Sequence, residues 1–262
     1  MSSPDEVILV PHPTVRRRAA RHLLAASNGV AHAHALVDVD YGAVDAVRGR
    51  RGPAWREEHG HGLGCLPFVA RAVLLAVEAY PRLTARFTDE GLELRRTVGL
   101  GIAVDLDFEG LVVPVIQDAG RAGVPELARS IHTLAARARS GQLTGADVSG
   151  GTFTLSNPGP FGARQTLPIV NAPQVAIITV DAVAPRPVAV PDGRGGHTVV
   201  VRPVGNLTLA WDHRAFDGAY AARALGAVRE ALETHAWDAE FPVAPGPHTT
   251  ARPNGHRRSE HR

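Results

Sequence analysis

Hydrophobic and polar residues follow two kinds of spacing along this chain. Apolar residues recur every three to four positions in four segments, which predicts helices at 15–29, 67–80, 125–141 and 218–234. Alternation or a short apolar run predicts strands at 31–40, 99–104, 110–116, 151–156, 168–180, 198–204 and 207–211. Charged and glycine-rich residues around 55–64 predict a loop, and residues 186–196 predict a hairpin rich in proline and glycine. No internal repeat is evident.

Both ends of the chain lack this periodicity. Residues 1–14 contain three prolines and one apolar run at 7–10, and we expect them to form an arm that lies on the domain. Residues 241–262 are rich in proline, histidine and arginine, which predicts a disordered tail. The sequence therefore predicts one domain over residues 15–240, between an arm and a tail.

The composition narrows the classes of function. Lysine is absent, which excludes Schiff-base chemistry on a lysine and a Walker-type phosphate loop. The formal net charge is +2 and aromatic residues make up 5% of the chain, so neither a polyanion partner nor a base-stacking surface for nucleic acid is favoured. The single cysteine, Cys65, cannot form an internal disulfide and predicts a buried thiol in a reducing compartment. Since no stretch predicts a membrane span or a secretion signal, we expect a cytoplasmic protein without a membrane partner.

Two further patterns resemble cofactor sites only superficially. His32 and His34 share one face of a predicted strand, but no cysteine or carboxylate accompanies them at a recognisable ligand spacing, and the same holds for His59 and His61. We therefore expect no metal. Residues 99–101 have Gly-x-Gly spacing, yet a second strand follows them instead of a helix, so a β-hairpin is a better interpretation than a dinucleotide-binding turn.

Candidate chemistry lies at two strand ends. The strand 207–211 leads into a charged turn that contains His213 and, four positions later, Asp217; Gly218 then opens a helix. The strand 151–156 ends at Ser156, directly before a turn that begins at Asn157. Turns between rigid elements present side chains to substrates. Taken alone, His213 favours a solvated turn, and Ser156 is at least as compatible with a hydroxyl that ties down its own turn.

The residues around His213 also resemble a known signature. His213-x-x-x-Asp217-Gly218 resembles the active-site pattern of the chloramphenicol acetyltransferase-like superfamily. The fuller string Asp212-His213-Arg214-x-x-Asp217-Gly218 resembles the narrower pattern of the dihydrolipoamide acyltransferases, the catalytic cores of 2-oxo acid dehydrogenase complexes. Other stretches resemble the same family in the same order, at 15–20, 37–40, 110–116, 150–157 and 168–177. Ordered matches from about residue 7 to about residue 234 are more specific than one short motif.

The resemblance implies an α/β (α+β) sandwich of the chloramphenicol acetyltransferase-like type, with a mixed sheet flanked by helices. It further implies a homotrimer in which coenzyme A and dihydrolipoamide enter a channel between subunits from opposite ends. In that channel His213 of one subunit would face Ser156 of the next.

The resemblance also assigns supporting roles. Asp217 is counted among the catalytic residues, but its implied role is to anchor the loop and not to relay charge. It would do so through a buried ion pair with Arg16, for which Arg17 is the near alternative. Losing one member of such a pair costs about 3–5 kcal/mol. Asn157 and Gly218 would support the site structurally.

These roles agree with ordinary acid–base chemistry. A thiol of pKa about 8.5 is mostly protonated at neutral pH and an imidazole of pKa about 6.5 is mostly unprotonated, so His213 would accept the thiol proton as attack begins. The Ser156 hydroxyl would donate a hydrogen bond to the negative oxygen of the tetrahedral intermediate, and deleting such a donor costs roughly 10²–10³ in rate. The leading hypothesis is an acyltransferase that moves an acyl group between dihydrolipoamide and coenzyme A.

Other features depart from the family pattern. The chain begins almost at the catalytic domain and has no lysine to carry a lipoyl group, so we expect the lipoyl group on another protein. The implied partners are that lipoyl-bearing protein, a 2-oxo acid decarboxylase and lipoamide dehydrogenase. The C-terminal end lacks the short apolar finish by which family trimers assemble into cages, which favours a trimer. Two alternatives stay open: a stand-alone acyltransferase that uses a small molecule or a carrier protein, and a non-catalytic trimeric scaffold.

Overall fold

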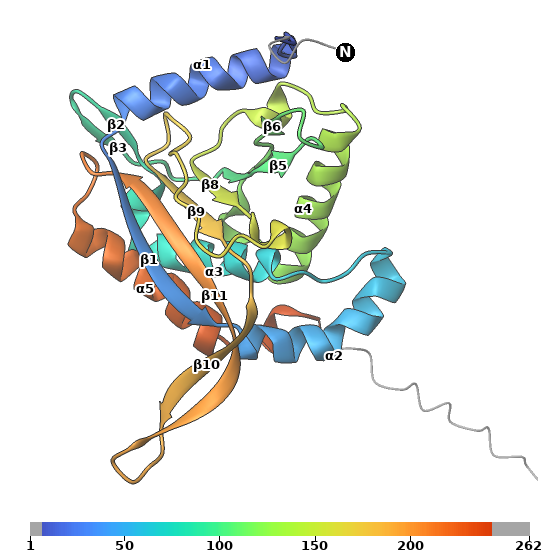
Figure 1. The fold of residues 1–262 in the computed structure, drawn as a ribbon, viewed down its shortest axis with the longest axis vertical. Helices are drawn as coiled ribbons and strands as arrows, with labels where there is room; N and C mark the ends of the chain where they lie inside the picture. The colour runs from blue at the N-terminus through green and yellow to red at the C-terminus, as the bar shows by residue number, and fades with distance from the viewer. Residues whose placement is uncertain (1–6, 243–262) are drawn as a thin grey trace, which may run out of the picture.

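The computed structural model describes residues 7–242 of the chain (Figure 1). The α-helices there are α1 (Thr14–Gly29), α2 (Gly42–His59), α3 (Leu66–Ala79), α4 (Val124–Arg139) and α5 (Gly218–Thr234). Short 3-10 helices are η1 (Pro81–Thr84), η2 (Ala119–Arg121), η3 (Ala146–Val148), η4 (Gly159–Phe161) and η5 (Trp237–Glu240). The expected helices correspond to α1, α3, α4 and α5, whereas α2 was not expected. Within residues 7–242, no helix has both the length and the apolar character that crossing a bilayer requires.

The strands form one large sheet and two small ones. They are β1 (His32–Asp40), β2 (Arg86–Thr88), β3 (Gly91–Glu93), β4 (Leu100–Ile102), β5 (Val104–Asp105), β6 (Leu111–Val112), β7 (Val115–Ile116), β8 (Phe153–Ser156), β9 (Ala176–Val180), β10 (Ala184–Pro191) and β11 (His197–Asp212). The large sheet has the order β1-β11-β9-β8-β4-β7, with β10 on β11. Its β4–β8 and β8–β9 pairs are parallel and its other pairs antiparallel. The expected mixed sheet flanked by helices is confirmed.

One long strand, β11, organises this sheet. It pairs with β1 and β9 along its second half and with β10 along its first half, which projects from the body as a two-stranded ribbon (Figure 1). The sequence predicted two strands here, at 198–204 and 207–211, but the strand continues through Gly205. A Cβ at this position would lie 2.9 Å from the Val183 side chain and 3.1 Å from the Tyr41 ring, so the glycine lets β11 pass beneath both.

The core lies between the sheet and the helices that cover it. Helix α5 packs on β1, and α3 packs between α4 and α5. The predicted apolar stripe of α3 is fully buried, with Phe68, Val69 and Val73 at 0% exposure. A helix that is apolar on nearly all sides is expected at such a central position. By contrast, only Ala26 of α1 is buried, so α1 lies on the surface.

The loop predicted around residues 55–64 is wrong up to His59, where α2 ends. Val44, Val47 and Trp55 are buried on one side of α2, and their burial stabilises a helix that contains Pro53. A proline inside a helix removes one backbone hydrogen bond and breaks the sequence pattern, although tertiary packing can override it.

Three other expectations need correction or a narrower statement. The apolar residues 7–10 are 74–92% exposed, so this arm does not pack on its own domain. The strand expected at 168–180 covers only 176–180, because the prolines of the preceding stretch donate no ladder hydrogen bond. Phe241 is buried against Phe68 and Trp55 and belongs to the body, while residues 243–262 of the expected tail lie outside the described residues.

Candidate active site

His213 lies where β11 leaves the sheet. Its backbone N–H donates to the Ala31 carbonyl oxygen, just before β1, at 2.8 Å. The imidazole is 50% exposed, and its ring centroid lies 5.9 Å from that of Trp211. The buried Trp211 indole N–H donates to the Phe216 carbonyl oxygen at 2.9 Å, and α5 begins at Gly218. The turn therefore presents His213 to solvent from a buried, hydrogen-bonded support.

The two neighbours of His213 clamp each other. Arg214 donates from Nε and Nη2 to the two carboxylate oxygens of Asp212, at 2.9 and 2.6 Å. Burial alone would raise the pKa of Asp212, but the hydrogen bonds from Arg214 outweigh burial and hold the pKa below its usual value. The Arg214 guanidinium also lies 4.4 Å from the centre of the Phe87 ring. The motif quoted from the sequence contains Asp212 and Arg214, but sequence reasoning assigned neither residue a role. A carboxylate at the end of a buried strand was the signal that could have indicated an ion pair there.

Asp217 and Arg16 do not meet within one chain. The Asp217 carboxylate is 91% exposed and lies 3.9 Å from His213 Nδ1. Arg16 donates instead to the Phe108 carbonyl oxygen at 2.6 Å. The alternative, Arg17, donates to a carbonyl and a hydroxyl at the start of its own helix. The single chain therefore lacks the expected buried ion pair, because its two members lie at different ends of the sheet.

Ser156 ends β8 and is half-buried. It lines a pocket of about 290 Å³ together with Asn157, so these two expected site residues are brought together. The other lining residues are Ala103, Asp105, Phe108, Leu111, Pro158 and Phe161. This pocket opens beside a hydroxyl, and most of its remaining walls are apolar.

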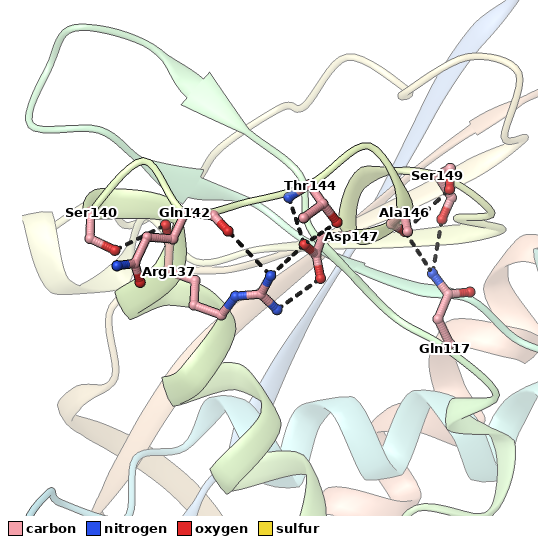
Figure 2. A network of polar contacts seen from close by, with 8 residues as sticks. All are labelled: Gln117, Arg137, Ser140, Gln142, Thr144, Ala146, Asp147 and Ser149. Atoms are coloured by element: carbon pink, nitrogen blue, oxygen red, sulfur yellow. Dashed lines mark hydrogen bonds and ion pairs between the residues drawn. The ribbon is translucent and has the colours of Figure 1, made fainter.

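Polar networks fix the backbone on both sides of β8. After β8, the buried Asp181 carboxylate accepts hydrogen bonds from the Thr166 hydroxyl at 2.7 Å and the Thr166 N–H at 3.2 Å. Before β8, the Asp147 carboxylate accepts hydrogen bonds from Thr144 and from both terminal nitrogens of Arg137 (Figure 2). The Thr144 hydrogen bonds, followed by those of Arg137, lower the pKa of Asp147. Ser156 is thus held by fixed loops as well as by its strand.

The loop that enters β8 is tied from a second side. Gln117 donates to the Ser149 carbonyl oxygen at 3.0 Å (Figure 2). A Cβ at Gly99 would lie 2.1 Å from the Gly150 carbonyl oxygen, so sheet packing explains this glycine. The antiparallel β4–β7 and β5–β6 pairs confirm the hairpin expected here.

Strand register separates Ser156 from His213. Ser156 is level with Thr179 on β9, and Thr179 is level with Thr208 on β11. His213 lies five residues beyond Thr208 in sequence. Because β11 runs antiparallel to β8 and β9, these five residues lead away from the end of the sheet that holds Ser156. At about 3.3 Å per residue and about 4.8 Å per strand spacing, the two positions are about 19 Å apart. One chain therefore cannot bring both side chains to one reacting atom.

A polar network that sequence reasoning missed runs from the exposed His22 on α1 to the buried Thr154 on β8. The Thr154 hydroxyl donates to Gln174 Oε1 at 2.6 Å, and Asn171 Nδ2 lies 3.4 Å from the Thr154 oxygen. Asn171 Oδ1 also lies 3.0 Å from His22 Nε2. The signal was present, because Asn171 and Gln174 belong to a stretch that resembles the family. These side chains position the loop before β9.

The strand histidines contact the backbone. His32 Nε2 accepts the Val170 N–H at 3.0 Å and its Nδ1 lies 3.1 Å from the Val30 carbonyl oxygen, which fixes a neutral tautomer. His34 Nε2 lies 3.1 Å from the Pro168 carbonyl oxygen. Both imidazoles thus anchor residues 168–170.

Three further histidines, His59, His61 and His132, form a ring cluster near α2. His61 stacks on His132 with 3.8 Å between ring centroids, and His59 packs on Trp55 at 4.0 Å. Burial, and then the charge of His61, lower the pKa of His132. In the described part of the chain, no three or more His, Cys, Asp or Glu side chains are arranged to hold a metal ion.

A larger cavity, of about 810 Å³, lies along α2 and contains neither Ser156 nor His213. Arg48 in its wall is already bonded to Asp45 at 2.6 Å and to the Leu63 carbonyl oxygen at 2.9 Å. Cys65 follows this wall and is half-buried, which is less than the full burial expected. Partial burial still raises the pKa of its thiol, which favours the unreactive protonated form.

Solved structures define the class of protein. The structure of a probable dihydrolipoamide acetyltransferase from Listeria monocytogenes matches with a TM-score of 0.81 and 32% identity, over 88% of this chain and 95% of that one. The cubic core of the pyruvate dehydrogenase multienzyme complex matches with a TM-score of 0.80 and 29% identity, over 88% and 96%. The fold is that of these acyltransferase cores.

Relatives narrow the class to a family. The dihydrolipoyllysine-residue acetyltransferase component of the pyruvate dehydrogenase complex from Mycobacterium tuberculosis is 40% identical over 78% of this chain and 37% of its own length. The succinyltransferase component of the 2-oxoglutarate dehydrogenase complex from Haemophilus influenzae is 34% identical over 86% and 53%. The family of 2-oxoacid dehydrogenases acyltransferase (catalytic domain) matches residues 4–237, and the chain belongs to this family. It spans between about a third and about half of these two relatives.

Proposed function

We propose that this chain transfers an acyl group between dihydrolipoamide and coenzyme A, as the catalytic core of a 2-oxo acid dehydrogenase complex. The observation that carries the proposal is the pair of strand ends in a member of this acyltransferase family: a supported, half-exposed imidazole at one and a hydroxyl beside a pocket at the other.

The two side chains account for a balanced thioester exchange. His213 accepts the proton of the attacking thiol while its sulfur forms a bond to the acyl carbon. The Ser156 hydroxyl donates to the oxygen that becomes negative. The old carbon–sulfur bond then breaks, and the departing thiolate recovers the proton from His213. No electron transfer is involved, and His213 and Ser156 end in their starting states.

The site is proposed to form between two copies of the chain, in a homotrimer. The separation of about 19 Å within one chain favours this arrangement, because a thioester spans only a few ångströms. The arrangement also supplies the missing ion pair. Arg16 lies at the rim of the Ser156 pocket, through its bond to the Phe108 carbonyl, and Asp217 lies beside His213. Bringing His213 to the Ser156 of a neighbour therefore brings Asp217 towards that neighbour's Arg16.

Two exposed apolar surfaces support self-association. One is the arm at 7–10. The other is a face of the β10–β11 ribbon on which Pro187 pairs with Val201 and Ala189 with Val199; the two valines are 71% and 70% exposed. An isolated two-stranded ribbon is marginal in water, and exposed apolar patches of this kind mark protein contacts.

The substrates and partners follow from the same proposal. Coenzyme A is one thiol, and the other is a dihydrolipoyl group whose lysine lies outside residues 1–262, which contain none; we propose that another protein carries it. The partners are then the lipoyl-bearing protein, a 2-oxo acid decarboxylase and lipoamide dehydrogenase. The solved relative from the pyruvate dehydrogenase complex is a cubic core, and for this chain we propose the trimer alone.

The test mixes the purified chain with free dihydrolipoamide and, in turn, acetyl-, propionyl-, isobutyryl- and succinyl-coenzyme A. Thioester exchange with at least one donor, in a preparation that is trimeric by light scattering, is the expected result. Absence of exchange with all four donors would exclude the proposed reaction and leave two roles, a stand-alone acyltransferase with another acceptor and a non-catalytic scaffold.

A further inference from the structure

The pocket beside Ser156 bears on which acyl group this chain transfers. The inference rests on the proposed function. Relatives named for acetyl transfer and for succinyl transfer are 40% and 34% identical to the chain, so overall similarity does not identify the acyl group. We propose that this pocket accepts a small uncharged acyl group and excludes acyl groups that end in a carboxylate.

The chemistry of the lining supports this choice. The wall contains two phenylalanines, a leucine, an alanine and a proline besides Ser156 and Asn157. Its single ionisable side chain is Asp105, and none of its lining residues is an arginine or histidine. A terminal carboxylate that enters this space leaves water, meets a like charge and finds no cation. Like charges placed together in this way cost several kcal/mol in protein interfaces.

Asp105 is held at the pocket by a strained turn. Asp107 and Phe108 have φ of 51° and 68°, and the Glu109 N–H donates to the Leu106 carbonyl oxygen at 3.0 Å, which defines a type I′ turn. Phenylalanine is rarely found in this left-handed region. The Asp105 carboxylate accepts the Phe108 N–H at 3.3 Å, so the turn fixes the carboxylate and the ring together.

The two phenylalanines limit the size of the acyl group. Phe108 on the turn and Phe161 at the end of η4 both line the pocket, with 6.4 Å between their ring centroids. They are 77% and 68% exposed in the single chain. Holding such rings in solvent is unfavourable without a partner, and an apolar acyl chain would bury their inner faces.

The cation bound to this turn does not compensate Asp105. Arg16 bonds to the turn at the Phe108 carbonyl oxygen and does not line the pocket. In the proposed trimer its charge is further neutralised by Asp217 of the neighbour. The pocket therefore keeps a net negative character towards an incoming acyl group.

The experiment measures kcat/KM for the four acyl-coenzyme A donors with free dihydrolipoamide, using the full chain. We expect the value for succinyl-coenzyme A to be lower than that for acetyl-coenzyme A by about tenfold or more. Asp105→Asn should raise the succinyl-to-acetyl ratio by about tenfold. The matched control is Asp107→Asn, which removes the same charge from the same turn outside the pocket and should leave the ratio unchanged. Phe161→Ala should raise the isobutyryl-to-acetyl ratio by widening the pocket.

The outcomes separate the two proposals. Exchange with succinyl-coenzyme A as efficient as with acetyl-coenzyme A, or equal shifts in Asp105→Asn and Asp107→Asn, would overturn the selectivity while leaving the acyl transfer intact. Absence of exchange with every donor would overturn the acyl transfer itself. Both proposals are supported if the parent chain prefers a neutral donor over succinyl-coenzyme A and if Asp105→Asn weakens this preference while Asp107→Asn does not.

Discussion

The two ends of the sheet support their functional side chains in opposite ways. At the His213 end, the Asp212–Arg214 clamp and the Trp211 hydrogen bond fix a turn whose base is buried. At the Ser156 end, the strand is fixed, but the pocket beside it is walled by two exposed aromatic rings, Phe108 on a strained turn and Phe161 at the end of η4. A proton acceptor must hold one orientation, whereas a recognition surface is completed only when substrate and neighbour arrive. The difference suggests that catalysis depends mainly on the first end and selectivity on the second.

The largest effect is expected from His213→Ala. Loss of the general base should lower kcat for thioester exchange by about 10³-fold, within the range of 10²–10⁴ for such groups. The rate of new thioester formation, followed by its ultraviolet absorbance, is the measurement. His132→Ala, which removes an exposed imidazole from α4, is the control and should retain the parent rate. An unchanged rate in His213→Ala would exclude acyl transfer through this site.

Ser156→Ala should lower kcat by roughly 10²–10³-fold with a smaller change in KM, because its hydroxyl acts on the transition state. Ser140→Ala is the matched control, since Ser140 bonds only within its own helix end.

Co-refolding the two inactive variants in equal amounts tests the shared site directly. In a trimer with one such site at each interface, chance pairing of an intact histidine with an intact serine should restore about a quarter of the parent activity. No recovery, in a preparation shown to contain mixed trimers, would place both side chains in the same subunit's site.

Arg214→Lys should have a moderate effect. Lysine keeps the charge but cannot donate two parallel hydrogen bonds to Asp212, so the imidazole loses its fixed orientation. We expect kcat to fall about tenfold with KM nearly constant, since misplacement of a catalytic group costs up to about 10²-fold. Arg223→Lys on the exposed side of α5 is the control. A change in KM alone would contradict a positioning role.

The smallest effects concern stability against acid, and the larger of the two is expected at Asp212. Hydrogen bonds hold the pKa of Asp212 below its usual value in the folded protein, so the unfolded protein binds more protons as pH falls. The stabilisation is complete above the ordinary pKa of about 4 and is lost as pH falls below it. Asp212→Asn should therefore lower the free energy of unfolding at pH 7 by about 1.5–3 kcal/mol, the range for a hydrogen bond to a charged group, and by less at pH 3. Urea denaturation at both pH values measures this. A loss of equal size at pH 3 would contradict the assigned cause.

Asp147→Asn offers the comparison at the other end of the sheet. Its carboxylate also has a lowered pKa, from the Thr144 hydrogen bonds first and Arg137 second, but it lies in a surface loop. The loss at pH 7 should have the same sign and be smaller than for Asp212→Asn, because solvent screens a surface ion pair.

Much of this architecture could be predicted from local pattern. The apolar periodicity located α1, α3, α4 and α5, and alternation located β1 and the strands that end at Ser156 and His213. Two of the failures, at α2 and at β11, share one cause, which is that contacts distant in sequence overrode a local signal. Helix α2 contains Pro53 and is stabilised by the burial of Trp55, and β11 passes Gly205 because Tyr41 and Val183 leave room only for a glycine.

The sequence by itself determined the family and the presence of an imidazole and a hydroxyl at two strand ends, because motifs and periodicity are local properties. Only the tertiary structure decided that these groups lie about 19 Å apart in one chain, since this depends on which strands pair and in which register. It also decided that Arg16 contacts Phe108 and not Asp217, and that Asp105 faces the pocket beside Ser156. Strand order is set by burial of the whole core, and no short stretch of sequence contains it.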